Sequence, residues 1–244
     1  QLIKIKYKNL IKEINLNLIG KIQIKNILMA AMAAQKSNLN FENILKVLPK
    51  LKSVEGRLEK IGKIKNNSIV ILDYAHTPDA LKVCLLNIKE QFPDKKLNLL
   101  FGCGGNRDQN KRMKMGKIAS IYADNIYLTD DNPRYENPVK IRKDIKKGIK
   151  VKKIKEISNR SIAISEAIKN LKSGDVLVVA GKGHENIQEI GKKKIKFSDR
   201  KKILIEIQKK NKNLSNQLKI NIIKELSKTQ KLSKSISINM ARIN

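Results

Sequence analysis

Four clusters of glycines and polar or charged side chains each come directly after a short apolar run of the sequence. The clusters are DYAHTPD (73–79), GCGGNRD (102–108), TDDNPR (129–134) and GKGHE (181–185). The runs before them have the composition of buried strands: SIVIL (68–72), LNLLF (97–101), NIYL (125–128) and DVLVVA (175–180). In open α/β sheets, ligands bind beyond the carboxyl ends of the strands. We therefore expect the four clusters to line one rim of a sheet.

The clusters contain the groups needed to bind a ligand with both carboxylates and amines. Arg107 and Arg134 can hold carboxylates, and Asp131 and Glu185 can accept hydrogen bonds from ammonium groups. Glycines in the same loops allow close approach of the backbone and offer N–H donors. These glycines are Gly102, Gly104, Gly105, Gly181 and Gly183. The pattern predicts recognition of a zwitterion.

Several other kinds of site are absent from the sequence. It contains no G-x-x-x-x-G-K-[ST] phosphate loop, and GCGGNR is too short for a dinucleotide fingerprint. No spacing of His and Cys suits a metal ion, and no residues resemble a nucleophile with its base. Lys182 and His184 fit a packing or capping role as well as a binding role. On its residues alone, the chain is predicted to contain a ligand-binding α/β domain.

The formal net charge of +31 is typical of proteins that bind nucleic acids. The lysines, however, are spread through every segment, and the chain lacks the interleaving of aromatic and basic residues found in single-strand binders. We therefore expect a solvated lysine surface and no nucleic acid partner.

Arginine is scarce in this lysine-rich chain, which makes its eight positions informative. Only the planar guanidinium grips a carboxylate or phosphate with two parallel hydrogen bonds. An arginine in a candidate loop therefore supports a binding role. For Arg142, Arg160 and Arg242 we expect ordinary surface positions.

Residues 56–208 are predicted to form one α/β domain, with a Rossmann-like, mainly parallel sheet covered by helices on both faces. Apolar residues recur at helical spacing over 81–88, 115–122 and 164–171. Thr77 and Pro78 suit the N-cap and the first position of the helix that follows the first strand.

The flanking segments are expected to differ from this domain. Residues 1–55 read as the helical end of a preceding domain, without a closed core of their own. Because the chain begins at Gln1, we expect it to be a segment of a longer protein. Residues 209–244, rich in Lys, Asn and Ser, are predicted to be a flexible tail with at most one marginal helix.

The environment of the protein is predicted from what the sequence lacks. No apolar run is long enough for a membrane span, and no signal peptide pattern opens the chain. Cys84 and Cys103 are the only cysteines, so a disulfide framework is not expected. We expect a cytoplasmic monomer with no membrane partner.

Together, the motifs DYAHTPDAL, FGCGGNRD, TDDNPR, VLVVAGKGHE and FSDR closely resemble those of the Mur ligases of bacterial cell-wall synthesis. The resemblance spans about residues 15–207 and is closest to members that add meso-2,6-diaminopimelate. It implies that 1–55 ends a central ATP-binding domain and that 56–208 is the C-terminal, amino-acid-binding domain. The implied reaction uses ATP to phosphorylate UDP-N-acetylmuramoyl-L-alanyl-D-glutamate at its terminal carboxylate, which the amine of the amino acid then attacks.

The resemblance also implies roles for individual residues. Asn26, Arg57 and Asp73 match positions that contact ATP, with Asp73 suited to the ribose and Arg57 to the phosphates. Gln23 departs from the family pattern, which commonly has a second asparagine there. The residues implied to bind meso-diaminopimelate are Arg107, Asp131, Asn132, Pro133, Arg134, Gly181 and Glu185. Among these, Arg134 would hold the carboxylate at the distal centre of the amino acid.

Some parts of the family's machinery are expected upstream of residue 1. These are the uridine-nucleotide domain, the phosphate-cradling loop and the ligands of Mg²⁺. Two interpretations therefore stay open. The chain is either the C-terminal part of a complete ligase, or a catalytically inactive truncated remnant or amino-acid-binding module of the same fold.

Overall fold

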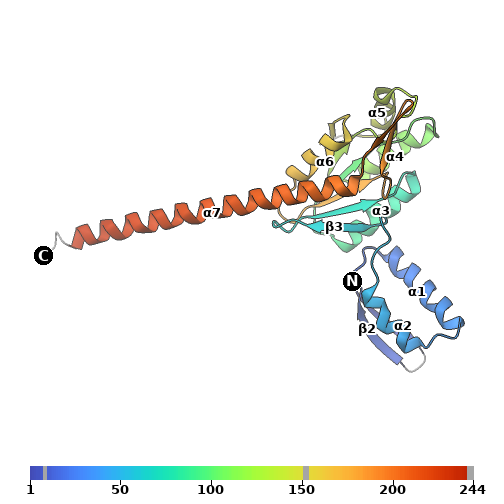
Figure 1. Cartoon of the computed structure of the whole chain (residues 1–244), viewed down its shortest axis with the longest axis horizontal. Helices are drawn as coiled ribbons and strands as arrows, with labels where there is room; N and C mark the ends of the chain where they lie inside the picture. The colour runs from blue at the N-terminus through green and yellow to red at the C-terminus, as the bar shows by residue number, and fades with distance from the viewer. Residues whose placement is uncertain (8–9, 151–153, 241–244) are drawn as a thin grey trace.

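The computed structural model describes residues 1–7, 10–150 and 154–240, with side chains as far as residue 221. Figure 1 shows a larger body, a smaller N-terminal body beneath it, and one long helix that projects away from both. Among the described residues, no helix combines the length and apolar character needed to cross a bilayer.

The larger body is built on a six-stranded sheet. In spatial order its strands are β3 (Glu59–Lys63), β4 (Ile69–Asp73), β8 (Val176–Ala180), β5 (Leu97–Phe101), β6 (Asn125–Leu128) and β7 (Ile154–Glu156). Neighbouring strands are parallel except for β3 and β4, which are antiparallel. The four predicted strands and the mainly parallel sheet are confirmed. The edge strands β3 and β7 were not predicted, because both are short and interrupted by charged residues.

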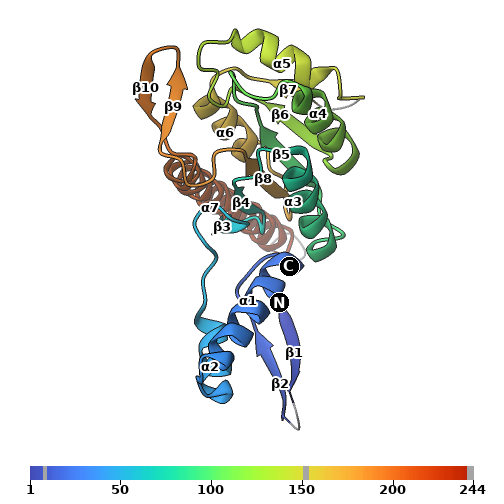
Figure 2. The same ribbon diagram turned by 90° about the vertical axis from the view of Figure 1, so that its right-hand side faces the viewer.

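Helices cover both faces of this sheet, as predicted. They are α3 (Pro78–Gln91), α4 (Asn110–Tyr122), α5 (Pro138–Lys146), α6 (Arg160–Lys169) and α7 (Asp199–Met240). Ile71 of β4 belongs to the core under α3, α4 and α5, whereas its neighbour Val70 belongs to the core under α6 and α7 (Figure 2). The predicted start of α3 is confirmed, since Thr77 accepts a hydrogen bond from the Ala80 amide at 3.3 Å and Pro78 opens the helix.

The N-terminal body has a small core of its own, which corrects the expectation for residues 1–55. It contains the hairpin strands β1 (Leu2–Tyr7) and β2 (Leu10–Asn15), helices α1 (Lys21–Lys36) and α2 (Phe41–Val47), and a 3-10 turn over Leu48–Lys50. The two helices were predicted and the hairpin was not. Six buried side chains form the core: Ile14, Leu16, Leu18, Ile27, Leu45 and Leu48. The hairpin supplies the second layer that the helices alone would lack.

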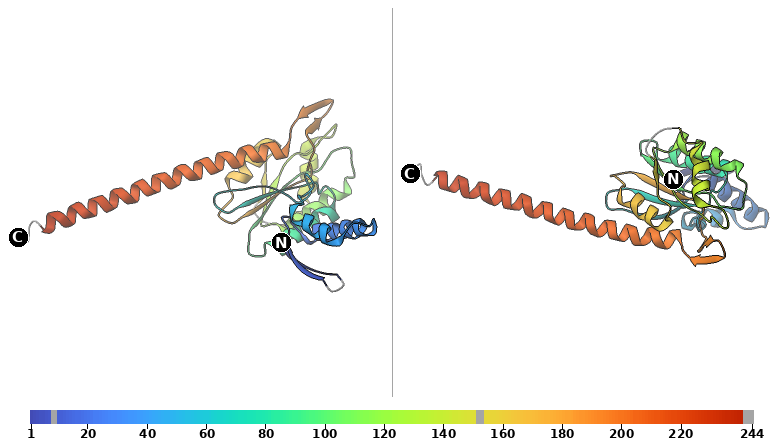
Figure 3. Two further views of the ribbon diagram at one scale, coloured as in Figure 1. Left: turned by 60° about the horizontal axis from the view of Figure 1, so that its bottom comes forward. Right: turned by 90° about the horizontal axis from the view of Figure 1, so that it is seen from above.

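Helix α7 replaces the flexible tail that was predicted from residue 209. It continues to Met240 and projects clear of the sheet in both views of Figure 3. Its first turns pack on the sheet through Ile203 and Ile207, and Lys210 donates hydrogen bonds to three carbonyls at the end of α6. The segment contains no glycine or proline, the two residues that interrupt a helix most strongly, and many lysines, which favour one. The weak apolar patterning of the sequence concealed this propensity.

A second small sheet stands apart from the main one. It consists of the antiparallel strands β9 (Ile187–Ile190) and β10 (Lys193–Lys196), which extend as a hairpin at the upper left of Figure 2. Backbone pairing of Ile190 with Arg134 joins this hairpin to the loop after β6. The sequence did not reveal it, because β10 is mainly lysine.

Two arginines expected at ordinary surface positions are buried, which corrects that expectation. Arg142 forms ion pairs with Asp130 and with Glu156, the latter at 2.8 Å. Arg160 is fully buried, and both of its hydrogen bonds to the carboxylate of Asp199 are short, at 2.8 and 2.6 Å. The same guanidinium donates to the Ala180 carbonyl oxygen at 2.9 Å. Arg242 lies outside the described residues.

Replacement of Arg160 by alanine is expected to lower the free energy of unfolding by about 3–5 kcal/mol, because it leaves the buried Asp199 carboxylate unpaired. Arg200 provides the control, since its ion pair with Glu59 is partly exposed. Arg200→Ala should cost no more than about 1 kcal/mol. Urea unfolding of the 244-residue chain, followed by circular dichroism, measures both. Equal losses in the two variants would contradict the account.

Candidate functional site

The loops after β4, β5, β6 and β8 line one cavity of about 560 Å³ at the carboxyl edge of the sheet. Six of the residues predicted to bind the amino acid are in its lining: Arg107, Asp131, Asn132, Arg134, Gly181 and Glu185. The seventh, Pro133, is not in the lining but lies against Gly105, where an added Cβ would come 2.0 Å from the Pro133 carbonyl oxygen. The loops after β5 and β6 therefore contact each other at residue 105, where only glycine leaves enough space. The predicted arrangement on one rim is confirmed, and the binding roles stay predictions.

Arg134 is held in place by both its backbone and its side chain. Its φ of 50° lies in the left-handed region, which is uncommon for a residue with a side chain. Its Nη1 donates a hydrogen bond to the Gly105 carbonyl oxygen at 3.0 Å, and its Nε lies 2.8 Å from a carboxylate oxygen of Glu189. Within the described part of the chain, Nη2 has no hydrogen-bond or ion-pair partner. One edge of the guanidinium is thus available to a ligand.

Glu185 is kept ionised by a buried lysine. The fully buried Lys182 ammonium donates to the Glu185 carboxylate at 2.9 Å, to the Asn132 amide oxygen at 3.0 Å and to the Ile187 carbonyl oxygen at 2.6 Å. The Asn132 amide nitrogen also donates to Glu185, at 3.1 Å. Burial alone would raise the pKa of Glu185, but these hydrogen bonds and the positive charges of Lys182 and Arg134 together lower it. The structure therefore places Lys182 in a supporting role.

Asp131 and Arg107 are the other charged residues of the lining that the sequence analysis selected. Asp131 is buried and accepts a hydrogen bond from the Asn132 amide at 2.7 Å, while Gln188 of β9 holds its carbonyl oxygen at 2.6 Å. A Cβ on Gly181, whose φ is 112°, would come 2.8 Å from the Asp131 carboxylate, so only glycine fits there without strain. Arg107 is exposed and forms no hydrogen bond or ion pair with any described residue. It is the cation with most freedom to meet a ligand.

The residues implied to contact ATP lie outside this cavity, toward the N-terminal body. Asn26 and Arg57 are both exposed, and the side chain of Gln23, one turn before Asn26, donates to the Arg57 carbonyl oxygen at 3.0 Å. This contact brings helix α1 next to Arg57. The guanidinium of Arg57 lies 4.7 Å from the centre of the Tyr74 ring, which itself lines the amino-acid cavity. Tyr74 was not singled out from the sequence, although it belongs to DYAHTPD.

Asp73 is placed differently from the other two. It is buried, and its two carboxylate oxygens accept hydrogen bonds from the backbone amides of Leu58, at 2.7 Å, and Ala75, at 2.8 Å. Burial raises its pKa despite these bonds and the nearby charge of Arg57. The structure thus shows Asp73 bracing the segment that carries Arg57. Direct contact of Asp73 with the ribose stays a prediction.

The two histidines lie beside the same tyrosine ring. His184 is exposed and its ring lies 5.2 Å from that of Tyr74, while His76 makes an edge contact with Tyr74 at 4.7 Å. These contacts support the packing role that was considered for His184.

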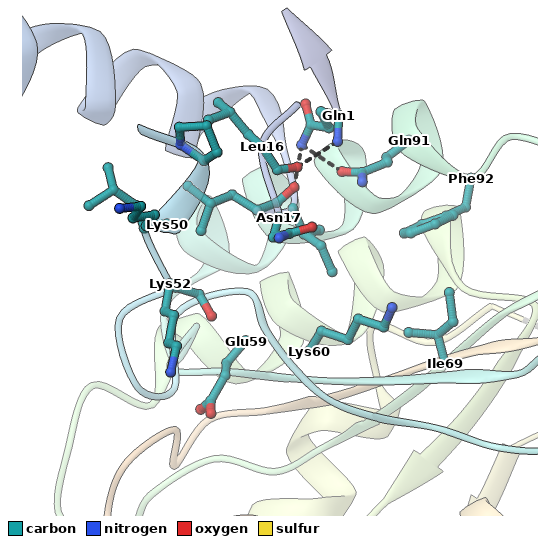
Figure 4. A pocket seen from close by; sticks show the side chains of 15 residues that line it. Gln1, Leu16, Asn17, Lys50, Lys52, Glu59, Lys60, Ile69, Gln91 and Phe92 are labelled. Carbon is teal, nitrogen blue, oxygen red and sulfur yellow. Dashed lines mark hydrogen bonds between the residues drawn. The ribbon is translucent and has the colours of Figure 1, made fainter. Parts of the chain in front are cut away.

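A larger cavity, of about 700 Å³, lies between the N-terminal body and the sheet. Figure 4 shows its lining, which includes the side chains of Lys50, Lys52, Glu59 and Lys60. No residue that the sequence analysis selected as a candidate site residue is in that lining. Its lysines come from the 3-10 turn, the segment after it and strand β3. The chemistry is concentrated in the smaller cavity at the carboxyl edge.

Comparison with known proteins agrees with this geometry. The family model for the Mur ligase, glutamate ligase domain matches residues 56–183. A UDP-N-acetylmuramoyl-L-alanyl-D-glutamate–2,6-diaminopimelate ligase of Rickettsia felis is 47% identical over 186 residues, which are 76% of this chain and 34% of the relative. The ligase of the same name from Buchnera aphidicola is 45% identical over 199 residues, covering 81% of this chain and 39% of the relative. The chain thus spans somewhat more than a third of the length of these relatives.

Solved structures show the same similarity. A structure of a UDP-N-acetylmuramoyl-L-alanyl-D-glutamate–2,6-diaminopimelate ligase is 32% identical, with a TM-score of 0.65, and the match covers 88% of this chain and 43% of that one. The UDP-N-acetylmuramate–alanine ligase of Thermotoga maritima, 19% identical, shares the fold with a TM-score of 0.57 over 84% of this chain and 40% of that one. The family match over residues 56–183, on the fold and site described above, shows that the chain belongs to the Mur ligase family.

Proposed function

We propose that this chain is the amino-acid-binding part of an ATP-dependent ligase that adds meso-2,6-diaminopimelate to UDP-N-acetylmuramoyl-L-alanyl-D-glutamate. The observation that carries the proposal is one cavity whose lining brings together Arg107, Arg134, Asp131 and Glu185. Relatives 42–47% identical are named as ligases of these two substrates. The reaction belongs to peptidoglycan synthesis, which implies a cytoplasmic enzyme.

The charges of the cavity match the groups of meso-diaminopimelate, which has two carboxylates and two amines. The open edge of Arg134 can hold the carboxylate at the distal centre, and the free guanidinium of Arg107 can hold the other. The ionised Glu185 can accept hydrogen bonds from an ammonium group, because Lys182 and Asn132 both donate to its Oε2, whereas Oε1 receives only a long hydrogen bond of 3.5 Å from the Tyr74 hydroxyl. The site therefore offers a guanidinium to each carboxylate and a carboxylate acceptor to an ammonium group.

The residues toward the N-terminal body fit a nucleotide in part. ATP, when bound, supplies activation of the acceptor carboxylate. Arg57, exposed beside Tyr74, suits a phosphate group, and Asn26 on the adjoining helix suits a polar group of the nucleotide. Asp73 acts through Leu58 and thereby positions Arg57. Among the described residues, no cluster of acidic, histidine or cysteine side chains could hold a metal ion, so this part of the chain is given no role toward Mg²⁺.

Substrate choice is expected to depend on Arg134. Arg134→Ala should weaken binding of meso-diaminopimelate by about 2 kcal/mol, roughly 30-fold, because the distal carboxylate loses its charged partner. Lysine lacks that carboxylate, so its affinity should change little. Arg134→Lys should restore only part of the loss, since a point charge lacks the planar fork. Calorimetry with both amino acids on the 244-residue chain measures this. Equal losses for the two ligands would mean that Arg134 only braces the loop.

The 244-residue chain alone is expected to bind meso-diaminopimelate and to form no amide bond. Its sequence lacks a phosphate-cradling loop, and the electrostatic stabilisation of such a loop is a large part of the chemistry of ATP. Incubation with ATP, Mg²⁺ and both substrates, followed by mass spectrometry of the products, decides the point. Detectable product would show that the chain is a complete catalyst.

In a full-length ligase that contains this chain, Asp73→Ala is expected to raise the KM for ATP more than the KM for the amino acid. The reason is that loss of the carboxylate releases the Leu58 amide and the adjoining Arg57. Arg57→Ala should reproduce the rise. Asp73→Asn is the control, because its one remaining acceptor oxygen should preserve part of the ATP affinity. An unchanged KM for ATP in Asp73→Ala would refute the assigned role.

A further inference from the structure

We propose that Glu189 is a positioning residue that holds the guanidinium of Arg134 toward the cavity and so determines preference for an amino acid with a distal carboxylate. The inference deepens the proposed function and rests on it for the identity of the ligand. Glu189 lies on β9, and neither its sequence context nor the resemblance to the Mur ligases singles it out.

The backbone of Glu189 fixes the backbone of Arg134. The Arg134 amide donates to the Glu189 carbonyl oxygen at 3.0 Å, and the Gly191 amide donates to the Arg134 carbonyl oxygen at 2.7 Å. These two bonds give Arg134 a parallel bridge to β9 and hold it at its left-handed φ. The hairpin thereby determines where the Arg134 side chain begins.

The side chain of Glu189 then fixes the direction of the guanidinium. Its carboxylate lies 2.8 Å from Nε of Arg134, and the Gly105 carbonyl oxygen takes a hydrogen bond from Nη1 at 3.0 Å. Arg134 lines the cavity and Glu189 does not, so the carboxylate contacts the guanidinium from behind. Arginine otherwise loses considerable rotamer freedom when it binds a ligand. Glu189 removes part of that entropy cost before the ligand arrives.

The ion pair also gives Arg134 a partner when no ligand is bound. With Glu189 present, Arg134 is paired whether or not a ligand carboxylate is bound. Preference for diaminopimelate over lysine therefore arises from the contact that its distal carboxylate gains at the open edge. The distal carboxylate obtains the full binding energy of this contact only if the Arg134 guanidinium already points toward it before binding.

The side chain of Glu189 can be removed without loss of the backbone clamp. Its amide donates to the Asn132 side chain at 3.1 Å and its carbonyl accepts from Arg134, and both bonds survive truncation to alanine. Glu156 offers a matched control, since its carboxylate lies 2.8 Å from Nε of Arg142 and its side chain is exposed to a similar extent. Glu156 does not line the cavity.

The first test is calorimetry of amino-acid binding to the 244-residue chain. Glu189→Ala should weaken binding of meso-diaminopimelate about tenfold, a common coupling for residues in contact. Lysine affinity should stay within about twofold, and Glu156→Ala should leave both affinities unchanged. Glu189→Gln, which keeps an acceptor oxygen, should fall between wild type and Glu189→Ala. Unchanged or tighter binding of diaminopimelate, or equal losses for both amino acids, would overturn the proposal.

A double variant shows whether Glu189 acts through Arg134. In the Arg134→Ala background, Glu189→Ala should cause no further loss of diaminopimelate affinity, because the group that it positions is gone. Additive losses would mean that Glu189 contributes through the general stability of the hairpin, and the positioning role would be wrong.

A ligand-free measurement separates failure of this inference from failure of the proposed function. The chain has only eight arginines, so its NMR spectrum should contain few Nε–H signals. The Arg134 signal can be assigned by its loss in Arg134→Lys. It should be protected from solvent exchange in wild type and lose that protection in Glu189→Ala but not in Glu156→Ala. If wild type binds no diaminopimelate while this pattern holds, only the proposed substrate is wrong; an Arg134 signal unaffected by Glu189→Ala overturns the positioning role.

Discussion

The buried ion pair between Arg160 and Asp199 is the interaction on which the geometry of the rim depends. It joins the first residue of α6 to the first residue of α7, and the same guanidinium holds the carbonyl of Ala180, the last residue of β8. The loop that carries Lys182 and Glu185 begins at the next residue. Helices α6 and α7 and strand β8 are thus joined by one guanidinium, next to Gly181 of the cavity lining. An unpaired charge at this buried position would be very unfavourable.

Two of the charged residues that line the cavity are themselves paired with an opposite charge outside its lining. Lys182 supports Glu185, and Glu189 supports Arg134. Such pairs hold each group in one orientation and keep it ionised, so the cavity is ordered before a ligand arrives. Arg107 differs from them, because it forms no hydrogen bond or ion pair with any described residue. The site therefore combines two braced charges, Arg134 and Glu185, with an arginine that no described residue holds.

The sequence revealed the part of the fold that depends on local patterns. Continuous apolar runs predicted the four central strands, and the rule for carboxyl ends placed their loops on one rim. The edge strands and the β9–β10 hairpin were not predicted because these strands are short and mix apolar with polar or charged residues. The role of Glu189 could not be predicted from the sequence for a different reason. Its partner lies 55 positions earlier in the chain, and no spacing rule connects a charge on one loop to a charge on another.

The buried cations explain why arginine and lysine are not interchangeable in this chain. The carboxylate of Asp199 accepts from Nε and Nη2 of Arg160, and the Ala180 carbonyl oxygen also accepts from Nη2. Two parallel hydrogen bonds to one carboxylate require the planar fork of a guanidinium. Lys182 instead meets three single oxygens, from a carboxylate, an amide and a carbonyl, which suits a compact ammonium with three donors. The shape of the acceptors therefore decides which cation occupies each buried position. An arginine in a lysine-rich chain indicates a forked partner, and that partner can be inside the protein as readily as in a ligand.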